Sequence, residues 1–229
     1  MNPAFYILVA GFFNVWEEFV ITAKERTLAT IAGKYDPSTD TGYYGFVESD
    51  DFINGDELAE QLKFKSGFGQ KSHAGWLKFY VGPNAICNSA GIQRIFYVAK
   101  MPLRYHVSWD EINNDGLIDG SRCVTVGKNT YSVRLLTGGR SKPGTGSEWN
   151  ELIYRVYHIP PAGRIAWDSF GDSELNISAV SGRYTWTQEK TNSSAVYRGK
   201  PGITYWLIAM TSFAGTNYGW RPVLERVFD

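Results

Sequence analysis

The sequence predicts a β-rich α+β protein, and three features of its composition support this class. Aromatic residues make up 15% of the 229 residues, and the chain contains 24 glycines. Hydrophobic residues reach 43% and charged residues 20%, which is enough apolar side chain for a buried core. Aromatic side chains interspersed with turn-forming residues favour short strands joined by ordered loops over helical bundles.

The N-terminal segment contains an apolar run of ten residues, 4–13 (AFYILVAGFF). It is too short to span a bilayer, and it lacks the basic region and cleavage site of a signal peptide. We therefore expect a buried strand interrupted at Gly11, followed by strands near residues 19–22 and 28–31. Without a signal peptide, synthesis in the cytoplasm is expected.

The next elements are predicted from turn and capping residues. Residues 34–41 form a polar turn cluster, and Asp56 is expected to N-cap a helix over residues 57–63 that ends near Gly67. After a loop rich in Gly, Ser and Lys, residues 76–81 (WLKFYV) alternate as a strand does. The turn region 83–91 suggests a boundary between an N-terminal β domain, residues 1–88, and a second domain, residues 89–229.

The second domain begins with a strand at residues 92–99, which we expect to continue over 101–107. Ser108 lies three residues before Glu111, the spacing of a capping box, and predicts a short helix. Residues 124–126 and 130–136, joined by Gly-Lys-Asn, predict a hairpin.

A glycine-rich loop at 137–146 precedes a helix over 147–156, where Ser147 is the expected cap and apolar residues recur at helical spacing. Short strands then follow Pro160 and Pro161 at residues 167–168, 185–189, 195–198, 204–210 and 223–228.

Charge and cysteine content exclude several functional classes. Lys and Arg together number 23, as do Asp and Glu, so no basic excess indicates a nucleic-acid groove. Cys87 and Cys123 make no disulfide framework and have no zinc-ligand spacing, so two free thiols are expected. No G-x-S-x-G, H-E-x-x-H or phosphate-loop motif is present, and the sequence predicts no enzyme, metal or cofactor.

Aromatic residues crowd the last strands and the loop at residues 211–219 (TSFAGTNYG). Tryptophan and tyrosine offer a large contact area at small entropic cost, and they stack on sugar rings. The competing interpretation is that most tryptophans of a small β-rich domain lie in its core. The predicted ligand or interaction residues are Tyr205, Trp206, Phe213, Asn217 and Tyr218.

Several short motifs occur through the second half of the chain, at residues 134–139 (RLLTGG), 146–150 (GSEWN), 167–168 (WD), 185–189 (TWTQE), 198–199 (RG) and 219–225 (GWRPVLE). Together they resemble motifs of virion proteins of tailed bacteriophages and prophages. The closing motif is similar to the final strand of the C-type-lectin-like fold shared by formylglycine-generating enzymes and phage tropism determinants. The resemblance covers about residues 92–229, and the active-site cysteines of formylglycine-generating enzymes have no counterpart in the last 100 residues.

The resemblance implies a C-type-lectin-like domain with short helices at residues 89–229, behind an N-terminal docking and assembly domain. Trp220 is expected to fill a core layer. Arg221, which Pro222 holds extended, is expected to reach loop carbonyls or a carboxylate such as Glu148 or Glu189. The residues implied to hold the scaffold are Glu148, Trp149, Trp186, Glu189, Arg198, Trp220 and Arg221.

The function implied is that of a virion structural protein, exposed on a tail fibre, on the baseplate or as capsid decoration. Its expected partners are further copies of itself, other virion proteins, and a host surface glycan or protein, with no nucleic acid and no membrane insertion. The alternatives are a carbohydrate-binding module, or a tail-associated glycan depolymerase with two carboxylates, for which Glu148 and Glu189 are candidates. Calcium is not predicted, because no acidic calcium loop is present.

Overall fold

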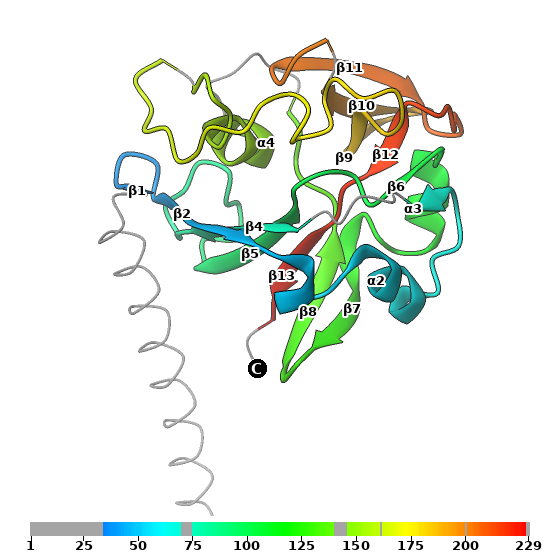
Figure 1. Ribbon diagram of the computed structural model, residues 1–229, viewed down its shortest axis with the longest axis horizontal. Coiled ribbons are helices and arrows are strands. Elements are labelled where there is room, and N and C mark those ends of the chain that lie inside the picture. Colours follow the sequence, from blue (N-terminus) through cyan, green and yellow to red (C-terminus); the bar gives the residue numbers. More distant parts are fainter. Residues whose placement is uncertain (1–33, 70–74, 140–145, 161, 200, 228–229) are drawn as a thin grey trace, which may run out of the picture.

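The computed structural model describes residues 34–69, 75–139, 146–160, 162–199 and 201–227. The strands predicted within residues 1–33 lie outside the described residues. The described chain is β-rich α+β, as predicted, with two sheets and a few short helices (Figure 1).

The larger sheet has seven strands in the order β1-β2-β4-β5-β13-β8-β7. The predicted strand at residues 76–81 and the predicted hairpin are confirmed. The strand predicted from residue 92 starts two residues later, at Arg94. The bounds are β1 Tyr35–Asp36, β2 Thr41–Val47, β4 Trp76–Val81, β5 Arg94–Ala99, β7 Asp119–Val126, β8 Asn129–Arg134 and β13 Val223–Arg226.

The second sheet has six strands in the order β11-β10-β9-β12-β6-β3, and it lies above the larger sheet in Figure 1. The bounds are β3 Phe68–Gly69, β6 Arg104–Tyr105, β9 Tyr184–Thr191, β10 Ser194–Gly199, β11 Tyr205–Met210 and β12 Tyr218–Trp220. The predicted continuation of β5 over residues 101–107 is wrong, because Pro102 has no N–H for a ladder and β6 instead pairs with β12. Residues 167–168 form no strand.

The helices follow local capping chemistry, with two corrections. The N-cap of α2 (Gly55–Leu62) is Asn54, whose side chain accepts from the Glu57 N–H, and not Asp56. Left-handed Lys63 ends this helix before Gly67. The capping box of Ser108 and Glu111 is confirmed at the start of α3 (Trp109–Asn114).

Ser147 caps α4 (Glu148–Glu151) as predicted, but a continuous helix to residue 156 is wrong. Leu152 departs from helical geometry, with φ of −117°, and the chain continues as a 3-10 turn over Ile153–Arg155.

The predicted boundary at residues 83–91 separates no structural units among the described residues. It falls between β4 and β5, which pair antiparallel along their whole length. Leu58 and Leu62 of α2 belong to the same buried cluster as Trp186 and Trp220. The described part of residues 1–88 therefore shares both sheets and both hydrophobic clusters with residues 89–229.

The closing segment joins the two sheets. Its first part, β12, lies in the six-stranded sheet between β9 and β6, and its last part, β13, lies in the seven-stranded sheet between β5 and β8. Only Arg221 and Pro222 separate these strands. The segment that carries the G-W-R-P-V-L-E motif is therefore a direct link between the sheets. No described helix is long and apolar enough to cross a membrane.

Candidate interaction surface and its buried framework

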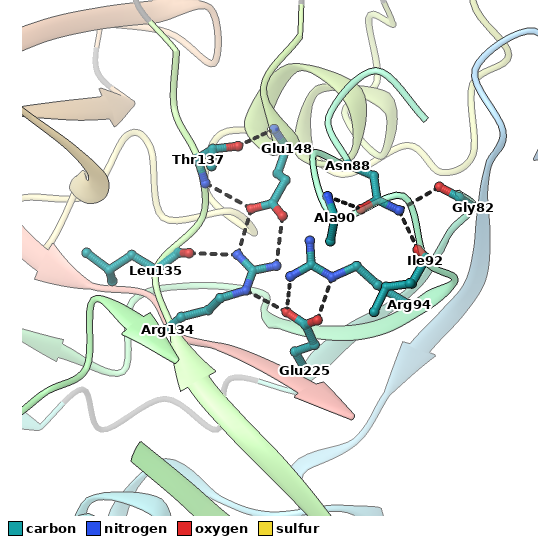
Figure 2. Close-up of polar contacts among 10 residues, drawn as sticks. All are labelled: Gly82, Asn88, Ala90, Ile92, Arg94, Arg134, Leu135, Thr137, Glu148 and Glu225. Carbon is teal, nitrogen blue, oxygen red and sulfur yellow. Dashed lines mark hydrogen bonds and ion pairs between the residues drawn. The ribbon is translucent and has the colours of Figure 1, made fainter. Parts of the chain in front are cut away.

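A buried chain of ion pairs connects four elements of the fold (Figure 2). Arg134 on β8 forms two parallel contacts with Glu148 on α4, from Nη2 to Oε1 at 2.7 Å and from Nη1 to Oε2 at 2.8 Å. Its Nε donates to Glu225 Oε2 on β13 at 2.8 Å, and Arg94 on β5 contacts both oxygens of Glu225. The planar guanidinium presents two parallel N–H groups that match the two oxygens of a carboxylate. Such a pair therefore fixes the relative orientation of the two side chains as well as compensating their charges.

The environment of this network favours the charged form of Arg134. Arg134 is 4% exposed and Glu148 is 1% exposed. Burial alone would lower the pKa of Arg134, but the two carboxylates outweigh burial and hold it above its usual value. Glu148 also accepts the Thr137 N–H at 2.9 Å, so its oxygens are occupied by donors of the fold.

Glu189 anchors the glycine-rich loop after β8. Its oxygens accept the backbone N–H groups of Gly138 at 2.9 Å and Gly139 at 2.7 Å. A Cβ at Gly138 would lie 2.6 Å from the Thr187 side chain, so this close approach requires glycine. Because Glu189 holds the two amides, it fixes the beginning of the loop whose described part ends at Gly139.

The buried arginines of the predicted scaffold bind neutral groups. Arg198 donates to the Asn150 side chain at 2.6 Å. Arg221 donates to the carbonyls of Lys100 at 2.9 Å and Leu175 at 2.5 Å. Of the partners predicted for Arg221, the carbonyls are present, while neither Glu148 nor Glu189 is hydrogen-bonded to it. Burial lowers the pKa of Arg221 to about 9 and that of Arg198 to about 10.

The three tryptophans of the scaffold motifs are fully buried. The indole N–H of Trp149 donates to the Ile203 carbonyl, and that of Trp186 donates to the Val107 carbonyl, both at 2.8 Å. Trp220 packs edge-on against Phe64 at 4.9 Å between ring centroids. These residues are core side chains that hold loops to the sheets.

The predicted interaction residues divide between core and surface. Tyr218 is only 7% exposed and stacks on Trp186 at 4.6 Å, so it is not part of the exposed surface. Asn217 is half-buried, and its carbonyl accepts the Tyr184 N–H at 2.8 Å. Phe213 is 48% exposed and touches the edge of Tyr218.

Strand β11 presents the largest group of exposed apolar side chains near these residues. Tyr205 and Trp206 are half-buried, whereas Leu207, Ile208 and Met210 are 45%, 47% and 60% exposed. The apolar run at residues 204–210 predicts the strand but not this exposure, since an uninterrupted apolar run is typical of a strand buried on both faces. We call Trp206, Leu207, Ile208 and Met210 of this strand, together with Phe213, the β11 surface.

Among the described residues, no group of three or more His, Cys, Asp or Glu side chains could hold a metal ion. The expectation of two free cysteines is confirmed. Burial raises the pKa of the Cys87 thiol to about 12, which keeps it protonated and unreactive at neutral pH.

A cleft of about 620 Å³ lies beside α2, away from the predicted interaction residues. Its lining includes Asp56, Glu60, Lys63, Lys65 and Arg104, so both signs of charge are present. Arg104 is already held by the carbonyls of the 65–67 segment. This arrangement selects no particular ligand charge.

Comparison of the chain with protein-family models, with curated proteins and with solved structures found no match. The function therefore has to be inferred from the chemistry of the β11 surface and its framework.

Acidification is expected to weaken the fold through Glu225. Burial alone would raise the pKa of Glu225, but hydrogen bonds and charge from Arg94 and Arg134 outweigh it and hold the pKa below its usual value of 4.5. The ionised carboxylate therefore stabilises the folded chain fully above about pH 4.5, and this stabilisation is lost as the pH falls through the lower folded pKa. Urea unfolding at a series of pH values should show a smaller loss on acidification for Glu225→Gln than for the unchanged chain.

The matched control is Glu60→Gln, on the exposed side of α2, which should leave the slope against pH as it is. An equal slope for Glu225→Gln and the unchanged chain would contradict this account.

Proposed function

We propose that the protein is a structural and recognition component of a tailed-phage virion, exposed on a tail fibre, on the baseplate or as capsid decoration. In this role it assembles with copies of itself and with other virion proteins. Its exposed loops meet a host surface glycan or protein. The class of protein is proposed from the virion-protein motifs. The separate roles of the buried framework and of the exposed surface are proposed from the structure.

One observation carries the proposal: the charged side chains of the motifs make their contacts with other groups of the fold. Glu148 is paired with Arg134, and Glu189 holds two backbone amides. Removing a partner from a buried ion pair leaves a charge without compensation, so such residues are constrained by the fold. The accessible part of the same region is apolar and aromatic, as expected of a protein that works through contacts.

The same observation weighs against the depolymerase alternative. Hydrolysis of a glycosidic bond needs two carboxylates about 5–9 Å apart with access to the substrate. Glu148 is 1% exposed, and both oxygens of Glu189 accept amide hydrogens. The proposal therefore assigns no hydrolysis to this pair.

A C-type-lectin-like arrangement of residues 89–229 is part of the proposal. It is supported by the closing motif, which supplies neighbouring strands to both sheets through β12 and β13. It is also supported by residues 137–139 and by the loop at 211–217, which the half-buried Glu189 and the buried Tyr218, respectively, attach to the sheets. In this arrangement the motif residues hold the scaffold and the loops are left to vary.

The mass of the full chain in solution tests the assembly role. We expect light scattering after column separation to give a defined oligomer, because an exposed apolar strand on a protein that stays monomeric would favour uncontrolled association. A monomer over a wide concentration range would contradict the assembly role. It would favour the carbohydrate-binding module, which a glycan array with Phe213→Ala would then examine.

A further inference from the structure

The free edge of the six-stranded sheet is formed by β11 (Figure 1). The strand pairs with β10 in unbroken register, from Ser194 opposite Met210 to Arg198 opposite Trp206. No other described strand lies on its outer side. An unpaired edge presents a row of N–H and C=O groups that can accept a further strand.

The orientation of the outer backbone groups follows from one hydrogen bond. The Thr211 N–H donates to the Ser193 carbonyl at 2.8 Å, so this N–H is directed toward the β10 side of the strand, whereas the Thr211 carbonyl accepts the Asp110 N–H. In an antiparallel ladder this orientation alternates along the strand. The backbone N–H and C=O of Ile208 therefore point to the free edge, as do those of Trp206.

The other sheet edges are protected in ways that β11 is not. Strand β7 carries Asp119 and Arg122, and its register with β8 shifts between them. The edge strands β1 and β3 have two residues each. Charges, irregular register and short length are the usual means by which proteins block edge pairing. Strand β11 is six residues long and contains neither a charge nor a proline.

The strand is complementary to itself. Two copies related by a two-fold axis perpendicular to the sheet pair antiparallel, and paired residues must then point to the same face. This condition allows registers centred on Leu207 or on Ile208. In both, apolar side chains meet apolar side chains and no like charges are opposed, because the strand carries none.

We propose that β11 is a homotypic interface, at which β11 of a second copy pairs antiparallel and joins two six-stranded sheets into one. The inference deepens the assembly role proposed above and rests on it for the presence of an oligomer. It locates the contact on the β11 surface, whereas the resemblance placed assembly in the N-terminal part.

The first test replaces Ile208 with proline in the full chain. Proline removes an N–H that points outward and leaves the donors facing β10 in place, and prolines are tolerated on edge strands for this reason. Light scattering should show an assembly of half the mass, with circular dichroism like that of the unchanged chain. The control Ile86→Lys, at a 64% exposed residue in the connection between β4 and β5, should keep the full mass.

The second test shows whether two copies of β11 pair, even if the proline variant does not fold. With exposed Cys123 replaced by serine, Leu207→Cys and Ile208→Cys are oxidised separately, beside Ile86→Cys as the control. We expect a disulfide-linked dimer from whichever residue lies on the two-fold axis and none above background from the control. The absence of a cross-link at both positions would overturn the proposal.

The outcomes separate this interface from the proposed function. An oligomer whose mass is unchanged in a folded Ile208→Pro variant overturns the β11 interface and leaves the assembly role standing. A monomeric unchanged chain overturns both. Loss of the oligomer in Ile208→Pro without a cross-link at 207 or 208 overturns self-pairing and indicates that a segment other than β11 of a second copy occupies the edge.

Discussion

Replacing Glu148 with alanine is expected to lower the free energy of unfolding by about 3–5 kcal/mol, the usual cost of breaking a buried ion pair. The change removes both oxygens that pair with Arg134 and the acceptor of the Thr137 N–H. Arg134 would keep its contacts with Glu225 and with the Leu135 carbonyl, but its Nη2 would be buried without its carboxylate partner. Urea unfolding followed by circular dichroism measures the loss.

Two further variants separate charge from packing. Glu148→Gln keeps the shape and one carbonyl acceptor, so we expect a smaller loss than for alanine. The double variant Arg134→Met with Glu148→Leu removes both charges and fills the volume, and replacements of this kind are often neutral. The double variant should therefore be more stable than Glu148→Ala alone. A single-variant loss below about 1 kcal/mol would show that the pair contributes little.

Features encoded by neighbouring residues could be predicted from the sequence. The capping box of Ser108 and Glu111 and the Ser147 cap depend on contacts within one helical turn. The hairpin depends on a tight turn between two strands that follow each other. In each case the partners are only a few residues apart, so local chemistry is sufficient.

Features that depend on distant partners could not be predicted. Strand β13 enters the sheet between β5 and β8, about 90 or more residues from either, and nothing in the local pattern indicates this position. The apparent boundary at residues 83–91 is a turn between two strands of one sheet. The helix from Ser147 breaks at Leu152 although its apolar spacing would allow continuation.

In the candidate site, too, local features could be predicted and contacts between distant residues could not. The motif residues were identified as scaffold, but the Arg134 partner of Glu148 and the Gly138 and Gly139 partners of Glu189 emerge only from the fold. Tyr218 and Phe213 are similar in sequence context, and only packing places Tyr218 in the core. The exposure of β11 was missed because its composition is that of a central strand.

Trp220→Ala is expected to lower the free energy of unfolding by about 3–5 kcal/mol, because it leaves a large cavity in the core between the sheets. Trp220 is fully buried in the cluster that contains Phe64 and Trp186. The matched control is Trp206→Ala, at a half-buried residue of β11. We expect it to lower the free energy of unfolding clearly less than Trp220→Ala does. Urea unfolding compares the two, and equal losses would contradict the core position of Trp220.

Two tryptophan-to-phenylalanine variants separate the contribution of an indole hydrogen bond to stability from the contribution of side-chain volume. In Trp186→Phe the Val107 carbonyl loses its indole donor, and a buried group left unpaired costs about 1–3 kcal/mol. The indole nitrogen of Trp220 is buried and has no hydrogen-bond partner among the described residues, so Trp220→Phe removes only volume. We therefore expect Trp220→Phe to be the milder change by about 1 kcal/mol or more. A reversed order would mean that the Trp220 indole donates to a group that becomes available only in solution or in the assembled particle, and the closing motif would then have a role beyond the core.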